Sequence, residues 1–227
     1  MLRVGLTGGL GSGKSTVAAM LRELGAEVTE SDALGRAMME PGEPVFAEIV
    51  QHFGREVVGA DGRLNRARLA ELAFREGRLQ ELNAIVHPPV IEAQRCWMEK
   101  VAVRDPNTVA VIESALIFEV VRDAKARGET HGLLVDWRRR IDRVVVVTAP
   151  DEVKIARYVE RMVQTRAAWG VDRAAIETDA RRRLAQQVPD AEKAAQADYV
   201  IDNSGDTAAL SELVKALWPQ LKAESNK

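Results

Sequence analysis

Residues 8–16 have the residue types and the spacing of a phosphate-binding loop. The run Gly-Gly-Leu-Gly-Ser-Gly-Lys-Ser-Thr fits G-x-x-x-x-G-K-[ST], counted from Gly8 to Ser15. Glycines allow the backbone to turn tightly and to approach a polyphosphate closely. Lys14 has the reach to contact a β- or γ-phosphate, and the Ser15 hydroxyl is a Mg²⁺ ligand in such loops. An apolar segment precedes the run and an amphipathic pattern follows it, which disfavours the alternative of a glycine-rich turn that binds nothing.

Two acidic residues are expected near this loop, because each follows a predicted strand. Asp32 comes after residues 26–30 and Glu113 after residues 109–112. Open parallel sheets bind ligands at the carboxyl ends of their strands. Asp32 could accept a proton from a substrate hydroxyl or contact Mg²⁺, and the alternative is an N-cap of a helix that begins near Ala33. Glu113 could reach Mg²⁺ through water.

Residues 151–190 are rich in basic side chains on helical stretches. A phosphoryl-transfer lid needs mobile cations that close over the transferred group. The basic residues of this segment are Lys154, Arg157, Arg161, Arg166, Arg173, Arg181, Arg182 and Arg183. The alternative is a solvated helix face in which acidic residues balance the arginines. We favour this alternative for any single arginine, and the lid for the segment as a whole.

The composition limits the class of protein. The chain has 227 residues, of which 46% are hydrophobic, enough for one large domain with appendages. A net charge of −2 argues against a dedicated nucleic-acid binder, and no apolar run approaches membrane-spanning length. Cys96 is the only cysteine, so no internal disulfide forms and we expect a reducing, cytoplasmic location. The oligomeric state is open, and a monomer is compatible with the sequence.

Five segments are predicted to be the strands of the fold. They are residues 2–6, 26–30, 109–112, 144–147 and 199–201. Strands that are nearly continuous in β-branched residues and alternate with helices indicate a parallel sheet covered on both faces. We therefore predict an α/β fold of the P-loop NTPase type, with a five-stranded parallel sheet flanked by helices.

Helical patterns fill the chain between the second and third strands. Residues 45–103 are predicted to be helical, with interruptions at Gly54, at residues 59–62 and at His87-Pro88-Pro89. A lone histidine at such a break is more often structural than catalytic. The four tryptophans are scattered, which indicates packing rather than a base-stacking platform.

Taken in order, these motifs resemble the dephospho-CoA kinase family over nearly the whole chain. Besides the phosphate loop, the resemblance rests on Ser31-Asp32-Ala33, Leu82-Asn83 with His87-Pro88, residues 113–119, Asp142-Arg143 with the valine run, Arg157 with Arg161, Arg183 with Gln187, Glu192-Lys193 and residues 197–205. The phosphate loop alone would be generic. The ordered set, with its closing Ala-Asp-Tyr-Val-Ile-Asp-Asn, is much more specific.

The resemblance implies transfer of the ATP γ-phosphate to the ribose 3′-hydroxyl of dephospho-CoA, the last step of coenzyme A biosynthesis, with Mg²⁺ as cofactor. It implies that Asp32 is the catalytic base, assisted by Lys14, and that Arg161, or less favourably Arg157, is the lid arginine. The residues that it implies for ATP binding are Gly11, Ser12, Gly13, Lys14, Ser15, Thr16 and Asn203, with Asn203 beside the adenine.

The same resemblance divides the chain into three parts. Residues 1–44, 106–150 and 191–227 would form the nucleotide-binding core, residues 45–105 a helical substrate-binding region, and residues 151–190 the lid. Residues 120–140 and 162–180 are longer than is usual in the family, and the second stretch lets Arg166 compete with Arg161. Two alternatives stay open: another small-molecule kinase, such as a nucleoside monophosphate kinase, and a nucleotide-dependent switch. The arginine-rich segment and the missing guanine motif disfavour the switch.

Overall fold

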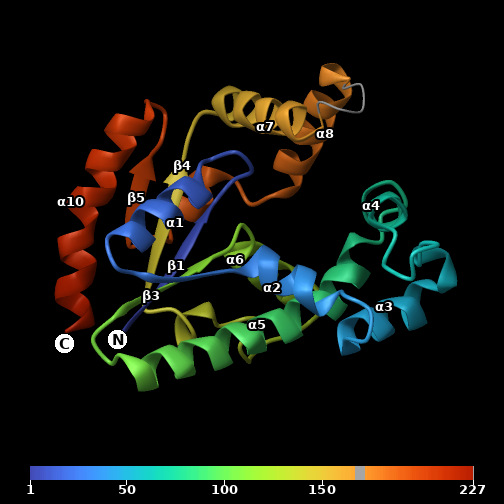
Figure 1. Cartoon of the computed structure of the whole chain (residues 1–227), viewed down its shortest axis with the longest axis horizontal. Coiled ribbons are helices and arrows are strands. Elements are labelled where there is room, and N and C mark those ends of the chain that lie inside the picture. Colours follow the sequence, from blue (N-terminus) through green and yellow to red (C-terminus); the bar gives the residue numbers. More distant parts are fainter. Residues whose placement is uncertain (167–171, 227) are drawn as a thin grey trace.

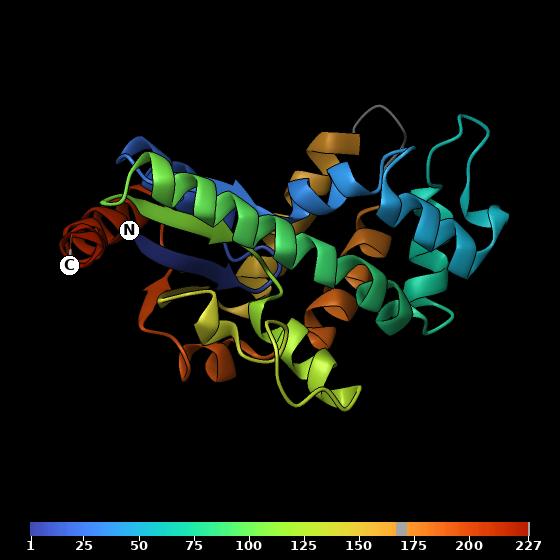
Figure 2. The ribbon, with the colours of Figure 1, turned by 90° about the horizontal axis from the view of Figure 1, so that it is seen from below.

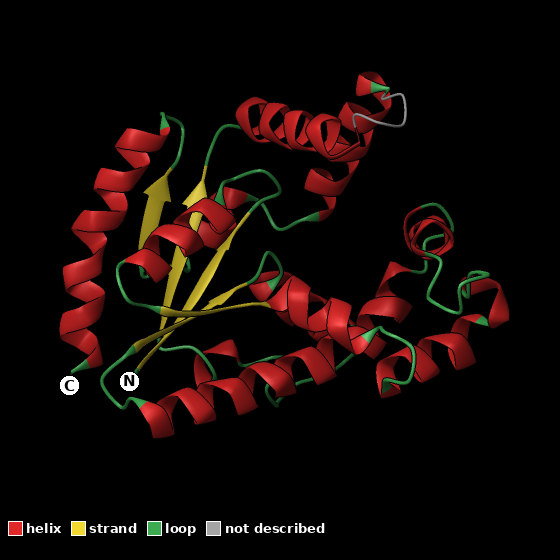
Figure 3. Cartoon of the chain, viewed as in Figure 1, coloured by secondary structure: helices red, strands yellow, loops and turns green. Residues whose placement is uncertain are grey.

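Five parallel strands form the centre of the molecule (Figure 3). The computed structural model describes residues 1–166 and 172–226. The strands are β1 (Leu2–Gly8), β2 (Glu27–Glu30), β3 (Val109–Glu113), β4 (Arg143–Thr148) and β5 (Tyr199–Asp202). They lie in the order β2-β3-β1-β4-β5, and each neighbouring pair is parallel. The predicted five-stranded parallel sheet is confirmed.

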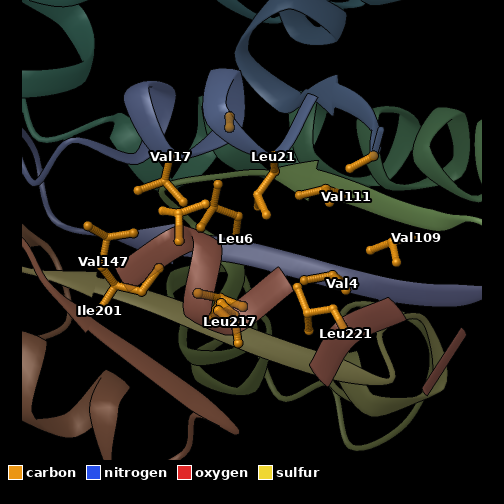
Figure 4. Packing of buried hydrophobic residues seen from close by; sticks show 14 of the residues in the cluster. Val4, Leu6, Val17, Leu21, Val109, Val111, Val147, Ile201, Leu217 and Leu221 are labelled. Atoms are coloured by element: carbon orange, nitrogen blue, oxygen red, sulfur yellow. The ribbon is translucent and has the colours of Figure 1, made fainter. Parts of the chain in front are cut away.

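One face of the sheet is covered by α1 (Lys14–Glu23) and α10 (Thr207–Ser225). Figure 4 shows Val17 and Leu21 of α1 over Leu6, with Leu217 of α10 on the same apolar layer. The side chains that alternate with these along the strands point to the other face. Burial on both faces explains why the central strands β3 and β4 are nearly continuous in apolar residues.

The opposite face is covered by α5 (Leu79–Arg104), α6 (Ile117–Ala126) and the short helix η2 (Trp137–Arg139). Figure 2 shows α5, in green, running along the sheet. Trp137 is buried against Phe118, with ring centroids 5.7 Å apart in an edge-to-face arrangement. Part of the longer segment 120–140 therefore packs into the core, and this tryptophan serves packing as predicted.

A helical region projects from the sheet on the side of β2 and α5 (Figure 1). It consists of α2 (Ser31–Met38), α3 (Pro44–Phe53), η1 (Arg55–Val57), α4 (Arg66–Phe74) and the first half of α5. Its own small apolar cluster includes Ile49, Val57, Leu72 and Ile85. The predicted interruption at Gly54 is confirmed, because α3 ends at Phe53 and Gly54 has a φ of 86°.

The predicted break at His87-Pro88-Pro89 is wrong. α5 continues through both prolines to Arg104. Each proline removes one helical hydrogen bond and costs about 3 kcal/mol in a helix interior. Packing on both sides of the prolines offsets this cost, because Ile85 is buried in the helical region and Met98 against the sheet.

The basic segment forms two helices, α7 (Asp151–Arg166) and α8 (Arg173–Gln186), followed by α9 (Asp190–Ala194). α7 and α8 lie side by side beyond the carboxyl ends of the strands (Figure 1). Residues 167–171, with Trp169 and part of the longer segment 162–180, lie outside the described residues. Among the described helices, none has both the length and the apolar character needed to cross a membrane.

Candidate active site

The phosphate loop joins the end of β1 to the start of α1, as predicted. Gly11 and Gly13 have φ values of 72° and 96°, a region that other residues rarely adopt. A Cβ atom on Gly11 would lie 2.1 Å from the carbonyl oxygen of Lys154, and one on Gly13 would lie 2.2 Å from the Nδ2 atom of Asn203. Both positions therefore require glycine, for conformation and for space.

Lys14 lies in the centre of this loop with its side chain buried. Its Nζ atom donates a hydrogen bond to the carbonyl oxygen of Gly9 at 3.0 Å. Burial lowers the pKa of Lys14 to about 8, although the negative charges of Glu113 and Asp32 raise it. The positive charges of Lys193 and Arg161 lower this pKa, so the charges of four residues from distant parts of the sequence act on the Lys14 ammonium.

Asp32 and Glu113 lie at the carboxyl edge of the sheet, next to Lys14. Glu113 ends β3, and burial raises its pKa while the charge of Lys14 lowers it. Asp32 is exposed in the first turn of α2. Its alternative role as an N-cap is wrong, because α2 begins at Ser31, directly after β2, and Glu30 holds the N-cap position. The Asp32 carboxylate is left to face the site.

The two candidate lid arginines differ in their contacts. Arg157 donates from Nη1 to the carbonyl oxygen of Asn203 at 2.8 Å and from Nη2 to that of Gly205 at 3.1 Å. Arg161 is exposed, and its guanidinium carbon lies 5.5 Å from the ring centroid of Tyr158. Its charge acts on both Lys14 and Glu113. These contacts favour Arg161 over Arg157 as the lid arginine, whereas the Arg166 side chain lies outside the described residues.

Asn203 reaches the phosphate loop from the end of β5. It is buried, and its Nδ2 atom donates to the carbonyl oxygen of Ser12 at 2.8 Å. Ser15 and Thr16 are exposed in the first turn of α1. The residues predicted to bind a nucleotide therefore surround one loop, although three of the strands separate Asn203 from Asp32 in the sheet order.

Sequence reasoning missed the contacts that join the segment after α8 to the phosphate loop, to α7 and to α6. The Leu10 amide donates to the Oε1 atom of Gln187 at 2.8 Å. Lys154, which is buried, lies 2.8 Å from Asp190 Oδ2, and Lys193 lies 2.7 Å from Glu119 Oε1. These pairs join residues that are tens of positions apart, so no local pattern could reveal them.

A cavity of about 440 Å³ opens beside Asp32, between α2, α5, β3 and α6. Its walls are mostly apolar and include Val86, Ile112 and Ile117. His87 also lines it, and burial lowers the pKa of this imidazole to about 4, so the ring is neutral at physiological pH. The Nδ1 atom of His87 is buried without a hydrogen-bond partner in the described part of the chain. The residue is thus part of a cavity wall rather than of a helix break.

Comparison with known proteins decides the family. The sequence model of the dephospho-CoA kinase family matches residues 2–209. The chain belongs to the dephospho-CoA kinase family. A dephospho-CoA kinase of Corynebacterium diphtheriae is 37% identical over 222 residues, which cover 97% of this chain and 98% of the relative. One of Corynebacterium jeikeium is 41% identical over 219 residues, covering 96% and 98% of the two chains.

Solved structures share the fold. The structure of TT1252 from Thermus thermophilus is 32% identical, with a TM-score of 0.66 and 97% of each chain covered. Dephospho-CoA kinase from Campylobacter jejuni has the same fold, with 18% identity, a TM-score of 0.62 and 97% of each chain covered. The resemblance inferred from the ordered motifs is confirmed for the family and for the fold.

The oxygen-bearing side chains at this family's phosphate loop fit a magnesium ion held together with a nucleotide. Mg²⁺ prefers oxygen ligands, keeps several waters and is bound through few protein groups. Ser15 is exposed at the start of α1, and the carboxylates of Asp32 and Glu113 lie near Lys14. Within residues 1–166 and 172–226, no group of three or more His, Cys, Asp or Glu residues forms a cage of its own. Ser15 with the carboxylates nearby would hold the ion only alongside phosphate oxygens.

Removing the Glu119 carboxylate should destabilise the protein strongly. Its Oε1 atom accepts hydrogen bonds from the Val188 amide at 2.9 Å and contacts Lys193, whose side chain is fully buried. Glu119→Ala leaves the ammonium of Lys193 buried without its partner, which should lower the free energy of unfolding by about 3–5 kcal/mol in urea denaturation. The control is Glu212→Ala, which breaks a surface pair with Lys215 and should cost under about 1 kcal/mol. Equal losses of unfolding free energy in the two variants would contradict a stabilising role for the buried Glu119–Lys193 pair.

Proposed function

We propose that this protein transfers the γ-phosphate of ATP to the ribose 3′-hydroxyl of dephospho-CoA, the final step of coenzyme A biosynthesis. The observation that carries the proposal is the meeting of Lys14, Asp32, Glu113 and Arg161 at one edge of the sheet, beside a cavity of about 440 Å³. The family supplies the identity of the two substrates.

In this proposal the phosphate loop binds ATP. Main-chain N–H groups of the loop and of the start of α1 hold the phosphates, with Gly11, Ser12, Gly13, Ser15 and Thr16 as the contact residues. Lys14 places its ammonium against the β- and γ-phosphates, and Asn203 borders the adenine. Mg²⁺, held through Ser15, neutralises phosphate charge when it is bound.

Asp32 acts as the general base. Its carboxylate accepts the proton of the 3′-hydroxyl as the hydroxyl oxygen bonds to the γ-phosphorus, and ADP leaves with the electrons of the broken P–O bond. Arg161 stabilises the charge on the transferred group. The exposed position of Arg161 on α7 supports a residue that approaches the phosphate only when the lid closes.

We assign nucleotide binding, acceptor binding and the lid to three separate parts of the chain. Residues 1–44, 106–150 and 191–227 bind the nucleotide, residues 45–105 bind the acceptor and residues 151–190 form the lid. The separate apolar cluster of the helical region supports treating it as a distinct part. The second half of α5 packs on β3, so this part is firmly attached to the core.

Acceptor selection tests the proposed function. Purified protein with ATP and Mg²⁺ is offered dephospho-CoA, a nucleoside monophosphate or no acceptor, and ADP and the phosphorylated product are quantified by mass spectrometry. We expect one product molecule per ADP with dephospho-CoA. Transfer to the nucleoside monophosphate instead would favour another small-molecule kinase, and phosphate release without an acceptor would favour a nucleotide-dependent switch.

ATP affinity should fall as the pH rises above about 8. Burial lowers the pKa of Lys14 to about 8 in the free protein, and an adjacent phosphate favours the charged form. Above pH 8 binding must therefore take up a proton, so the Kd for ATP should rise by up to about tenfold per pH unit. Calorimetry between pH 7.5 and 9.5 measures the Kd. In this range the phosphate groups have already lost their second proton (pKa about 6), so their own titration does not contribute to the pH dependence.

The control for this pH dependence is Lys14→Arg. A guanidinium stays charged in this range, because its pKa is above 12, so the Kd of this variant should be nearly independent of pH whatever its absolute value. The same slope in both proteins would show that Lys14 is not the group that takes up the proton.

A further inference from the structure

A second cavity continues from the one beside Asp32. It has a volume of about 680 Å³ and lies in the helical region, between α2, α4 and the start of α5. Both cavities are lined by the same five residues, which we call the cavity junction: Arg36, Met39, Phe74, Leu82 and Arg183. The two cavities therefore adjoin one another at the junction.

Two guanidinium groups from different parts of the chain border the junction. Arg36 is exposed on α2 and makes no ion pair within the part of the chain that the structure describes. Arg183 comes from α8, and its guanidinium carbon lies 4.9 Å from the ring centroid of Phe74 on α4. This stacking holds an arginine of the basic segment against the helical region.

The acidic residues near the junction are engaged elsewhere or shared. Arg183 Nε donates to Asp179 Oδ2 at 2.7 Å, but the other oxygen of that carboxylate pairs with Arg182. Glu40, in the wall of the second cavity, pairs with Arg63 at 2.7 Å. Asp61 in the same wall accepts the amide of Arg63. The five junction residues themselves carry two positive charges and no negative charge, which suits an anion with several oxygens.

Guanidinium groups bind phosphate oxygens in a planar, two-pronged geometry, and such charge-assisted hydrogen bonds are among the stronger ones in proteins. A ligand with its anionic group at the junction would place one end in the largely apolar cavity beside Asp32 and the other end in the larger cavity. Dephospho-CoA has this order of parts: a nucleoside, a 5′-diphosphate and a long pantetheine arm.

We propose that Arg36 and Arg183 bind the 5′-diphosphate of the acceptor at the cavity junction. This inference rests on the proposed function. The nucleoside then occupies the cavity beside Asp32, with its 3′-hydroxyl toward the carboxylate, and the pantetheine arm occupies the second cavity. The two helices of the basic segment have different tasks: α7 serves the donor through Arg161, and α8 recognises the acceptor through Arg183.

The test compares Arg183→Gln with Arg182→Gln. Arg182 is a matched control, because it also pairs with Asp179 and also lies over Phe74, at 5.5 Å, but it lines neither cavity. Each variant is assayed with dephospho-CoA and with adenosine, which lacks the diphosphate, using radiolabelled ATP. Binding of dephospho-CoA without ATP is measured by calorimetry.

We expect Arg183→Gln to lower kcat/KM for dephospho-CoA by about 10–100-fold and to raise its Kd by a similar factor. Its kcat/KM for adenosine and its KM for ATP should stay within about threefold of the wild type. Arg36→Gln should show the same selectivity, and Arg182→Gln should resemble the wild type with both acceptors.

Two results would overturn the inference while the proposed function stands: equal losses for dephospho-CoA and adenosine in Arg183→Gln, or equal losses in the Arg182 and Arg183 variants. An unchanged Kd for dephospho-CoA in Arg183→Gln would overturn it as well. Failure of the wild-type protein to phosphorylate dephospho-CoA would overturn the proposed function itself, and with it the inference.

Discussion

Replacing Lys14 by alanine should lower the rate of phosphoryl transfer by at least about 10²–10³-fold, the loss typical of removing one preorganised charge donor from a transition state. The ammonium is buried in the phosphate loop and donates a hydrogen bond to the carbonyl oxygen of Gly9. Alanine keeps the helix start and removes the side chain beyond Cβ together with the charge that would face the phosphates. Single-turnover kinetics with saturating ATP measures the effect on the chemical step.

The fold of this variant should survive. The lowered pKa of Lys14 means that its charged form is disfavoured in the folded protein, so removing the ammonium costs little stability. The matched control is Lys215→Ala, which removes a surface ammonium on α10 and should leave the rate unchanged. Near-normal turnover by a folded Lys14→Ala protein would contradict the phosphate-loop assignment.

Replacing Asp32 by asparagine should lower kcat by about 10²–10⁴-fold, the range of general-base contributions. Asparagine keeps the size of the side chain and its place on α2 but cannot take the proton of the acceptor hydroxyl. The KM for ATP should change little, because the phosphate loop is intact. Steady-state kinetics over both substrates separates the two parameters.

The melting temperature of Asp32→Asn distinguishes a base from a helix cap. Glu30 holds the N-cap position of α2, so the exchange should leave the melting temperature within about 2 °C, the effect of less than about 1 kcal/mol in a chain of this size. A marked drop in melting temperature with normal turnover per folded molecule would place the base elsewhere.

The sequence was sufficient to predict the features that depend on local patterns. The glycine-rich run predicted the loop because Gly11 and Gly13 need a backbone region and a space that only glycine provides. The three central strands β1, β3 and β4 were predictable because they are buried on both faces, which leaves runs of apolar residues in the sequence. The place of Asp32 followed from the rule that ligands bind at the carboxyl ends of parallel strands.

Features that depend on tertiary contacts could not be predicted. From the local sequence alone, Pro88 and Pro89 predict a helix break. The helix α5 is continuous because it packs against other elements on both sides of the prolines. Gln187 contacts Leu10, and Lys193 contacts Glu119, across long stretches of chain. The family resemblance already favoured Arg161 over Arg157, but the contacts of Arg157 with the Asn203 and Gly205 carbonyl oxygens became known only from the coordinates.

A crystal structure of the protein with dephospho-CoA and a non-hydrolysable ATP analogue tests the central claim most directly. We predict that the ribose 3′-oxygen lies within hydrogen-bond reach of the Asp32 carboxylate, about 2.6–3.2 Å, and in line with the γ-phosphorus. Lys14 and Arg161 should contact oxygens of the γ-phosphate that do not face the acceptor. A 3′-oxygen remote from Asp32, with another part of the acceptor facing the γ-phosphate, would contradict the account.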